Sequence, residues 1–487
     1  MQAITDMIDV APRDFRNGPM ASHKVTKVLW FQAAEAAAGG MLTLLSLWAD
    51  RGTVYMALAD ESARRVGVLR LDARTKTFPS VGAVHPPAQR LERAIADLFG
   101  ITPKGAADAR PWLDHGCWGI THPLGKPTEG NPASASAYTF LPVEGESLHQ
   151  VPVGPVHAGI IEPGHFRFAA QGETVVRLEE RLGYTHKGVD GLMTGATIPD
   201  AARLAARTSG DSTVAYGWAF AQAAEAALGA DVPERAIWLR ALMAELERLA
   251  NHLGDIGAIC NDAAFAMMLA RCSVLRERVL RACDTCFGQR MMRDCVIPGG
   301  VARDLDNDGQ RALRGLLDCI RDEFPALVRL YDRTASLLDR TVSTGILAPD
   351  LARRFGAGGF IGRASGRDFD ARRDLTYAPY CWLNFDVPCR DDGDVNGRIW
   401  IRIDEIEQSL SLITQILGRL PEGDIYARPV PVGAPRQGLG LVEGFRGDIL
   451  IWVALDAAGK VKRCHMRDPS WFQWPLLESV IEGNIIA

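Results

Sequence analysis

The sequence contains no apolar segment of the ~18–20 residues that a membrane-spanning helix needs. Its first residues also lack the basic and apolar stretches of a signal peptide, so we expect a cytoplasmic chain. Basic residues are not in excess. The net charge is −5 and the pI about 6.1, which argues against a nucleic-acid-binding protein. There is also no glycine-rich dinucleotide fingerprint after a strand and no phosphate-binding loop, so we expect no NAD or ATP site in this chain.

Cysteine is scattered along the chain. The ten cysteines form no disulfide framework, and we interpret them as free buried thiols. The one Cys-x-x-Cys motif, Cys283 and Cys286, falls in a segment predicted to be helical. Two helical cysteines without a second pair are more often buried neutral thiols than a metal or redox site. We therefore expect no iron–sulfur site in this chain.

The 487 residues are enough for two or three domains with a large core. Short apolar or alternating segments at residues 41–48, 53–58 and 66–71 predict strands, and apolar residues at helical spacing predict a helix over residues 88–99. We interpret residues 1–124 as a small α+β domain, whose first 20 residues form a loose arm. A linker rich in Pro, Gly and Ser follows over residues 125–150.

The second domain, residues 151–487, is predicted to be mainly helical. Long helical patterns cover residues 215–228, 232–253, 263–288 and 310–338, and we expect Pro325 to interrupt or kink the last of them. Helices of this length and apolarity predict a helix-bundle core. The predicted fold class is therefore α+β: a small N-terminal α+β domain, then a mainly helical domain with a few late strands.

Four polar residues lie close together near the start of this domain: His157, Glu162, His165 and Arg167, within eleven residues that also contain Gly and Pro. Two histidines, a carboxylate and an arginine suit a site at a subunit boundary, where titratable groups relay protons. A polar loop shaped by Pro and Gly is an equally good interpretation. Glu179, Glu180 and His186 are the next candidates, although their segment also reads as a solvated charged stretch with Tyr184 packing beneath it.

Residues 153–168 resemble the opening of the large subunit of membrane-bound [NiFe] hydrogenases of the formate hydrogenlyase type. They are also similar to the 49 kDa subunit of respiratory complex I. Further matching blocks lie at residues 255–262, 298–304, 363–366 and 394–409. The resemblance covers nearly the whole chain and implies a hydrogenase-large-subunit-like helical domain.

The N-terminal domain has a resemblance of its own. Residues 91–101 and 118–124 look like the 30 kDa subunit of complex I, and fusion of the two parts is itself a pattern of the family. Spacing alone predicts that Glu92, Arg93 and Asp97 form a solvated helix face. The resemblance implies that this helix is an interaction surface.

The hydrogenase resemblance implies a nickel–iron centre held by two Cys-x-x-Cys pairs, the first of which reads Arg-Ile-Cys-Gly-x-Cys. Here that block is Arg-Thr-Ser-Gly-Asp-Ser, with Ser209 and Ser212 at the ligand positions. A hydroxyl is a hard, weakly acidic donor and cannot replace a bridging thiolate. The second pair would lie shortly beyond residues 469–487, and the sequence stops at Ala487. We therefore expect no metal in this chain.

The resemblance implies a subunit of a membrane-associated redox complex, peripheral on the cytoplasmic side of the inner membrane. It would couple electron transfer at a neighbouring iron–sulfur subunit to ion translocation by antiporter-like membrane subunits. Iron–sulfur clusters belong to the partner, and quinone is a candidate acceptor, although the tyrosine that complex I places near the quinone head has its counterpart close to Gly210. Tyr216 stands where the family carries a histidine.

The candidate catalytic residues are His157, Glu162, His165, Arg167, His186 and Tyr216. Two alternatives stay open: a non-catalytic scaffold that holds the iron–sulfur subunit, and a hydrogenase subunit whose metal ligands come from elsewhere in the complex.

Overall fold

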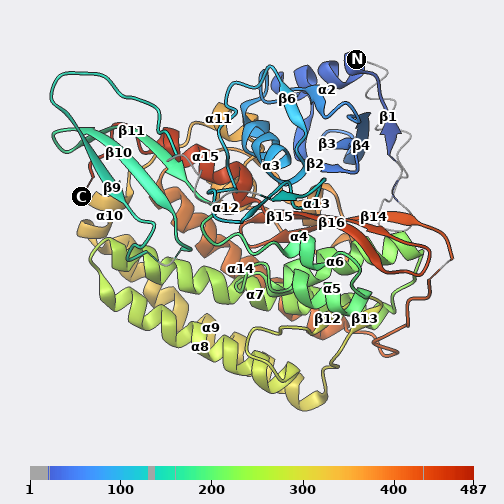
Figure 1. Ribbon diagram of the computed structural model, residues 1–487. Coiled ribbons are helices and arrows are strands. Elements are labelled where there is room, and N and C mark those ends of the chain that lie inside the picture. Colours follow the sequence, from blue (N-terminus) through green and yellow to red (C-terminus); the bar gives the residue numbers. More distant parts are fainter. Residues whose placement is uncertain (1–19, 21, 130–137, 160, 432, 487) are drawn as a thin grey trace.

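The computed structural model describes residues 20, 22–129, 138–159, 161–431 and 433–486 (Figure 1). The predicted N-terminal arm and residues 130–137 of the predicted linker thus lie outside the described residues, apart from residue 20. No helix among the described residues is both long and apolar enough to cross a bilayer. Helices and strands are mixed, which confirms the predicted α+β class.

A four-stranded sheet forms the N-terminal domain, in the order β1-β4-β3-β2. Its strands are β1 (His23–Lys24), β2 (Thr43–Asp50), β3 (Thr53–Asp60) and β4 (Arg65–Asp72), and its helices are α2 (Lys27–Ala38) and α3 (Gln89–Phe99). The three predicted strands and the helix at residues 88–99 are confirmed. Two small parallel strands, β5 (Thr77–Pro79) and β6 (Thr102–Lys104), flank α3.

Both faces of this sheet are buried. One face packs on α2 and α3, through a core that includes Trp30, Met56 and Leu91. The other face packs on a second sheet, where Trp48 lies 5.7 Å from Trp452, centroid to centroid. The N-terminal domain and the second domain therefore share a hydrophobic cluster between their two sheets.

The second sheet, of order β14-β15-β16, is the middle layer (Figure 1). Its antiparallel strands are β14 (Arg436–Gly444), β15 (Gly447–Leu455) and β16 (Val461–Arg467), and its far face packs on α6 (Thr213–Leu228). Helix and sheet approach so closely that a Cβ at Gly438 or Gly440 would overlap with backbone carbonyl groups of α6. Glycine is required there for this close approach rather than for an unusual backbone angle.

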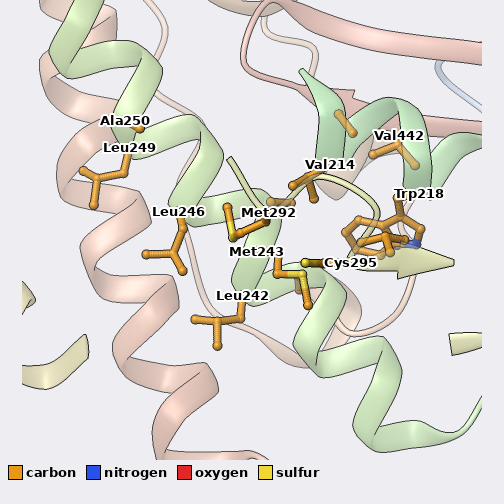
Figure 2. Packing of buried hydrophobic residues seen from close by; sticks show 14 of the residues in the cluster. Val214, Trp218, Leu242, Met243, Leu246, Leu249, Ala250, Met292, Cys295 and Val442 are labelled. Atoms are coloured by element: carbon orange, nitrogen blue, oxygen red, sulfur yellow. The ribbon is translucent and has the colours of Figure 1, made fainter. Parts of the chain in front are cut away.

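Long helices form the outer layer: α7 (Glu234–Asp262), α8 (Ala266–Phe287), α9 (Asn307–Arg333) and α14 (Val395–Arg419). The stripe Leu242, Leu246 and Leu249 of α7 faces the interior, and Figure 2 shows α7 meeting Val214 and Trp218 of α6. This confirms the predicted helical core. Of the two outcomes expected at Pro325, the interruption is wrong and the kink stays a prediction: α9 continues through Pro325, with Phe324 and Leu327 packed in the core, and ends at Arg333.

A third sheet carries the segment with the predicted site. It contains β9 (Leu148–Val153), β10 (His165–Gln171) and β11 (Thr174–Arg181), and the C-terminal helix α15 (Ser470–Val480) packs beside it. The remaining elements are short: η1 (Pro86–Ala88), β7 (Ile120–Thr121), β8 (Thr128–Glu129), α4 (Val189–Leu192), α5 (Ile198–Ala205), β12 (Val296–Ile297), β13 (Gly300–Val301), α10 (Ala335–Thr341), α11 (Pro349–Arg354), α12 (Gly359–Arg363), α13 (Ala371–Asp374) and η3 (Tyr380–Trp382).

Two predicted solvated surfaces are wrong. On α3, Glu92 and Arg93 are buried. Glu92 accepts hydrogen bonds from the Ser80 hydroxyl (2.7 Å) and from the backbone N–H of Val81 (2.5 Å), and Arg93 donates to the carbonyl oxygen of Arg110 at 2.7 Å. On β11, Glu179 and Glu180 are also buried, and Tyr184 is exposed rather than packed beneath them.

All ten cysteines lie within the described residues, and no disulfide joins them. The prediction that they are buried holds for Cys283, inside α8, but Cys117, Cys381 and Cys389 are exposed. Burial raises the pKa of Cys286 to about 11, which keeps this thiol neutral.

Candidate functional site

Two adjoining cavities lie where the N-terminal domain meets β16 and α15. The first, which we call the apolar cavity, has a volume of about 280 Å³. Leu91, Ile95 and Leu98 of α3 form one wall, with Trp48 from β2. The N-terminal domain thus contributes directly to the walls of this site.

The second, which we call the polar cavity, has a volume of about 410 Å³. It shares Glu162, His186, Tyr216, Asp468 and Trp471 with the apolar cavity. Its own walls add Ser209, Asp211 and Arg446 on one side and Trp112, Trp474 and Arg90 on the other. Charged groups and aromatic rings thus surround one space, next to a chamber lined mainly by hydrocarbon.

Tyr216 and Asp468 form the floor that the two cavities share. Tyr216 lies in the first turn of α6, and its hydroxyl donates to Oδ2 of Asp468 at 2.7 Å. Burial, together with the charge of Asp468, raises the pKa of Tyr216 well above its ordinary value. Tyr216 is therefore a neutral hydrogen-bond donor at any physiological pH.

Ser209, Asp211, Ser212 and Arg446 form a compact cluster at the edge of the polar cavity. The hydroxyl groups of Ser209 and Ser212 both donate to Oδ1 of Asp211, at 2.5 and 3.3 Å, and Arg446 donates to its Oδ2 at 2.5 Å. Burial alone would raise the pKa of Asp211, but Arg446 and the two hydroxyl groups hold it below its usual range. Within the cluster, the charge of Arg446 therefore balances the charge of Asp211.

This cluster does not fit a nickel–iron centre. Its donors are two hard hydroxyl oxygens, whereas nickel bound with iron requires thiolates. Both hydroxyl protons are directed at Asp211, whose charge Arg446 already balances. Among the described residues, no group of three or more His, Cys, Asp or Glu side chains converges on a point where a metal ion could lie.

Glu162 and His186 lie at the rim of the two cavities. The Thr185 hydroxyl donates to Glu162 at 2.6 Å, and Lys187 lies 3.5 Å from the same carboxylate. His186 stacks on Trp118, with ring centroids 5.3 Å apart. The surrounding protein shields part of the His186 ring from water, and this desolvation lowers its pKa. The imidazole is therefore neutral near pH 7.

His157 stays close to Glu162 without lining either cavity. Its Nε2 lies 3.1 Å from the carbonyl oxygen of Glu162, and its Nδ1 accepts from the N–H of Gly159 at 3.1 Å. Both ring nitrogens are therefore engaged in holding the loop that presents the Glu162 carboxylate.

His165 and Arg167 face a different space. Alternation along β10 puts both on one face of the strand, while Phe166, on the other face, packs toward Trp474. They line a third cavity of about 960 Å³, and Arg167 lies over the ring of Phe140, 4.2 Å from its centroid. The structure thus brings together Glu162, His186 and Tyr216, with His157 beside them, and separates His165 and Arg167 from this group.

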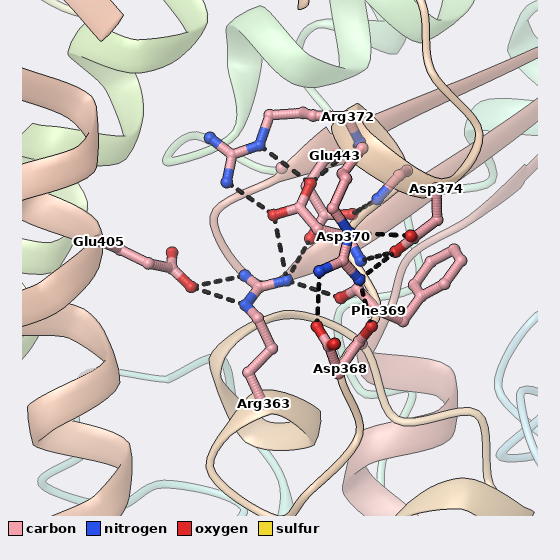
Figure 3. A network of polar contacts seen from close by, with 12 residues as sticks. Arg363, Asp368, Phe369, Asp370, Arg372, Asp374, Glu405 and Glu443 are labelled. Atoms are coloured by element: carbon pink, nitrogen blue, oxygen red, sulfur yellow. Dashed lines mark hydrogen bonds and ion pairs between the residues drawn. The ribbon is translucent and has the colours of Figure 1, made fainter. Parts of the chain in front are cut away.

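A buried network of ion pairs joins α12, α13, α14 and β14 (Figure 3). Its centre is Arg363, which donates to Glu405 at 2.8 Å and to Glu443 at 3.1 Å. Nε2 of His252 lies 2.7 Å from the other oxygen of Glu405, whereas Nδ1 of the same buried ring has no hydrogen-bond partner among the described residues. Burial would raise the pKa of Glu405, but Arg363 and His252 hold it well below its usual range.

This network anchors the turn that carries Arg446. Arg248, which lies 3.7 Å from Glu405, donates to the carbonyl groups of Glu443 and Gly444 at 2.9 and 3.0 Å. These residues end β14, and Arg446 follows two residues later in the turn to β15. The buried charges thus fix the backbone from which Arg446 reaches Asp211.

Sequence reasoning missed Arg446, Asp468 and the role of Asp211. Asp211 stands inside the block where the family carries thiolates, and its carboxylate was the visible signal. Asp468 directly precedes the Pro-Ser-Trp segment that resembles the end of the family's large subunit. For Arg446 we find no signal in the sequence, since its partner is 235 residues away.

Two known protein families match the chain. A family described as the 49 kDa subunit of respiratory-chain NADH dehydrogenase matches residues 262–439, and the 30 kDa subunit of the same enzyme matches residues 21–133. Formate hydrogenlyase subunit 5 of Escherichia coli is 31% identical over 446 residues, which cover 89% of this chain and 78% of that protein. This match spans both parts of the chain, so the fused arrangement has a counterpart among the relatives.

Two further relatives match most of their own length. The carbon monoxide-induced hydrogenase of Rhodospirillum rubrum is 30% identical, covering 70% of this chain and 95% of that protein. An NADH-quinone oxidoreductase subunit of Dehalococcoides mccartyi is 31% identical, covering 69% and 92%. Among solved structures, a chain of the archaeal membrane-bound sulfane sulfur reductase complex shares the fold, with a TM-score of 0.66 at 24% identity over 71% of this chain and 95% of that one.

Proposed function

We propose that the chain works in a membrane respiratory complex without a nickel–iron centre. It belongs to the family of the complex I 49 kDa subunit and the group 4 hydrogenase large subunits, and it carries a complex I 30 kDa-like domain at its N-terminus. One observation carries the proposal. At the ligand positions the structure has two serine hydroxyl groups, both committed to Asp211, which Arg446 neutralises.

We place the chemistry in the polar cavity. Electrons arrive from an iron–sulfur cluster of a partner subunit, and a small-molecule acceptor, for which quinone is the first candidate, is reduced beside Tyr216 and His186. The apolar cavity supports this assignment, since it offers hydrocarbon contacts to the body of an amphiphilic ring compound. The relatives that carry hydrogenase and NADH-quinone oxidoreductase names indicate the class of reaction, and the ligand positions argue against hydrogen as the substrate.

The remaining parts of the proposal concern the assembly. The chain lies on the cytoplasmic side of the membrane, against the iron–sulfur subunit, and transmits the redox event to antiporter-like membrane subunits that translocate ions. The candidate catalytic residues fall into two groups, which line different cavities. Glu162, His186 and Tyr216, positioned with the help of His157, face the acceptor, whereas His165 and Arg167 line the third cavity.

The test is metal analysis of the intact complex, purified through a tag on this chain. Nickel and iron are measured on one sample, together with hydrogen uptake and the reduction of a short-chain ubiquinone analogue by reduced viologen, above the enzyme-free rate. Iron without nickel, no hydrogen uptake and quinone reduction support the proposal. Stoichiometric nickel with hydrogen uptake overturns it and means that ligands come from another subunit.

A mutation distinguishes this proposal from the alternative that the chain is a scaffold without a reaction of its own. If the polar cavity is the reaction site, His186→Ala lowers acceptor reduction while the subunit composition and iron content of the complex stay unchanged. If the chain only holds its partner, the same variant leaves the rate per assembled complex unaltered. His149→Ala is a suitable control, because His149 is exposed on β9 and lines none of the three cavities.

A further inference from the structure

Glu247 is a buried carboxylic acid that the site described above does not use. It lies on α7, and its two oxygens accept from the backbone N–H groups of Val214 (2.7 Å) and Ala215 (3.1 Å) in the first turn of α6. The adjacent Arg248 turns away, toward the carbonyl groups of Glu443 and Gly444. Glu247 therefore sits behind the same helix start that presents Tyr216 to the polar cavity.

A small cavity of about 20 Å³ adjoins Glu247. Asp211 and Asn251 form its wall on the side of the polar cavity, and Arg276 and Arg290 form its wall toward α8. The volume is enough for one water molecule, which needs about 10–15 Å³ and two or more polar partners. Asn251 also donates to the carbonyl oxygen of Asp211 at 2.6 Å, which fixes this wall.

Asp211 borders both spaces. It lines the small cavity beside Glu247, and it lines the polar cavity, where its carboxylate accepts from the Ser209 hydroxyl at 2.5 Å. On the opposite side, Arg290 is exposed, so the small cavity lies close to solvent between α7 and α8. A line of proton-carrying groups therefore runs from the surface through the small cavity to Ser209.

We propose that Glu247 supplies the protons for acceptor reduction in the polar cavity, through one water molecule in the small cavity, Asp211 and the Ser209 hydroxyl. The inference rests on the proposed function. Reduction of a quinone to a quinol takes two electrons, from the partner's iron–sulfur cluster, and two protons. Each proton leaves the Glu247 carboxyl group and crosses the water to the Asp211 carboxylate. The Ser209 hydroxyl turns from Asp211 to the quinone oxygen, gives up its proton there and takes the proton of Asp211 in return, and Glu247 is protonated again from solvent on the Arg290 side.

The charges around Glu247 suit this role. Burial raises its pKa to about 8, against the two N–H groups that lower it, and the negative charge of Asp211 adds to the rise. The other groups that face it are Arg248 on its own helix, Cys283 and Arg276 on α8, and Arg290 beyond α8. Cys283 is neutral because burial raises its thiol pKa. Glu247 therefore holds a proton at neutral pH and can release it near pH 8.

The experiment is Glu247→Gln in the intact complex, with the short-chain ubiquinone analogue as acceptor and reduced viologen as donor. We expect the turnover rate to fall at least tenfold at pH 7. We also expect the alkaline decline of the wild-type rate near pH 8 to disappear, while assembly, iron content and reduction of the partner's clusters stay unchanged. Asp394→Asn is the matched control: Asp394 is also buried and accepts a backbone N–H at a helix start, from Gly397 at 2.7 Å, but lines none of the cavities.

A second variant keeps the test decisive if Glu247→Gln disturbs α6. Asn251→Leu leaves Glu247 in place and fills the small cavity, so we expect the same loss of rate. An unchanged rate and pH profile in an assembled Glu247→Gln complex, or an unchanged rate in Asn251→Leu, overturns the inference while the proposed function stands. A wild-type complex that reduces no quinone overturns both.

Discussion

The hydroxyl group of Tyr216 donates to Asp468 at 2.7 Å, joining the start of α6 to the residue that follows β16, 252 residues later in the chain. The pair closes the floor between the apolar and polar cavities. Because Tyr216 is buried and its pKa is raised, it can only donate this hydrogen bond. The other oxygen of Asp468, Oδ1, accepts from the backbone N–H of Ser470 at 2.9 Å, so both oxygens of this carboxylate are held in place.

Removing this hydroxyl should lower the reaction rate much more than the stability of the fold. We expect Tyr216→Phe to lower the proposed quinone reduction by the intact complex about tenfold or more, because Oδ2 of Asp468 then loses its donor and only the N–H of Ser470 still holds the carboxylate. The free energy of unfolding should fall by only about 1–2 kcal/mol, the usual effect of one lost buried hydrogen bond. Steady-state rates and urea denaturation measure the two effects.

Tyr331→Phe is the matched control for this change. Tyr331 is equally buried, and its hydroxyl donates to Asn396 at 2.7 Å, far from the two cavities. A similar loss of stability with a normal rate is expected. If both variants lower the rate per assembled complex equally, the Tyr216 hydroxyl has no special part in the reaction.

Removing one charge from the buried ion-pair network should strongly destabilise the fold. Glu405→Gln removes the negative charge between Arg363 and His252, both fully buried. Breaking a buried pair from one side typically costs about 3–5 kcal/mol, since the remaining charge is left uncompensated. We expect a loss of this size in urea denaturation of the full chain.

An exposed pair provides the comparison. Asp350 and Arg353 form an ion pair on the surface of α11, and Asp350→Asn should leave the unfolding midpoint unchanged because solvent screens such pairs. Were Glu405→Gln as mild as Asp350→Asn, the network would have to be redundant, with Glu443 and Asp370 sufficient to balance Arg363.

The elements that could be predicted are those whose pattern depends on their own residues. Alternation gave β2 and β3, and the apolar stripe with Leu242 and Leu246 gave α7. β14 was not predicted, because Gly438 and Gly440 have a low strand propensity. These two positions need glycine because α6 approaches the strand closely there, and the sequence around them does not reveal this approach.

The site residues also divide into those that a local motif predicts and those that depend on distant parts of the chain. Tyr216 and Ser209 were found because they stand in a motif with known ligand positions. Arg446 and Asp468 come from segments more than 200 residues away, and only the layered arrangement of α6 on β14 and β15 brings them to Asp211 and Tyr216. Glu92 was placed on a solvated face for a similar reason: the Ser80 loop that covers it is not part of the helical pattern.

The close approach of α6 and β14 can be tested with a pair of glycine substitutions. A methyl group at Gly440 would overlap with the backbone of Ala219, which cannot move without shifting α6, so Gly440→Ala should cost about 3 kcal/mol. Gly315, on α9, has open space around its missing side chain, and Gly315→Ala should stabilise by about 0.5–1 kcal/mol. Opposite shifts in melting temperature are expected, and shifts of the same sign would contradict the packing described for α6.

The last prediction concerns pH and Glu92. Burial raises its pKa to about 7, although the Ser80 hydroxyl and the N–H of Val81 oppose the shift. Since the pKa in the folded chain lies above its value in the unfolded chain, near 4.3, the folded state binds the extra proton between these values. The stabilising contribution is therefore complete below about pH 4.3 and is lost as the pH rises through 7. Glu92→Gln mimics the protonated acid at every pH.

We therefore expect the wild-type chain to lose stability relative to Glu92→Gln by about 2–3 kcal/mol between pH 5 and pH 8, at about 1.4 kcal/mol for each unit of pKa shift. Urea denaturation of both proteins at pH 5, 6, 7 and 8 measures this difference. Glu35→Gln, on the exposed face of α2, serves as the control, and its difference from wild type should not change with pH. A wild-type minus Glu92→Gln difference that stays constant over this range would mean that Glu92 is already charged in the folded protein at pH 5.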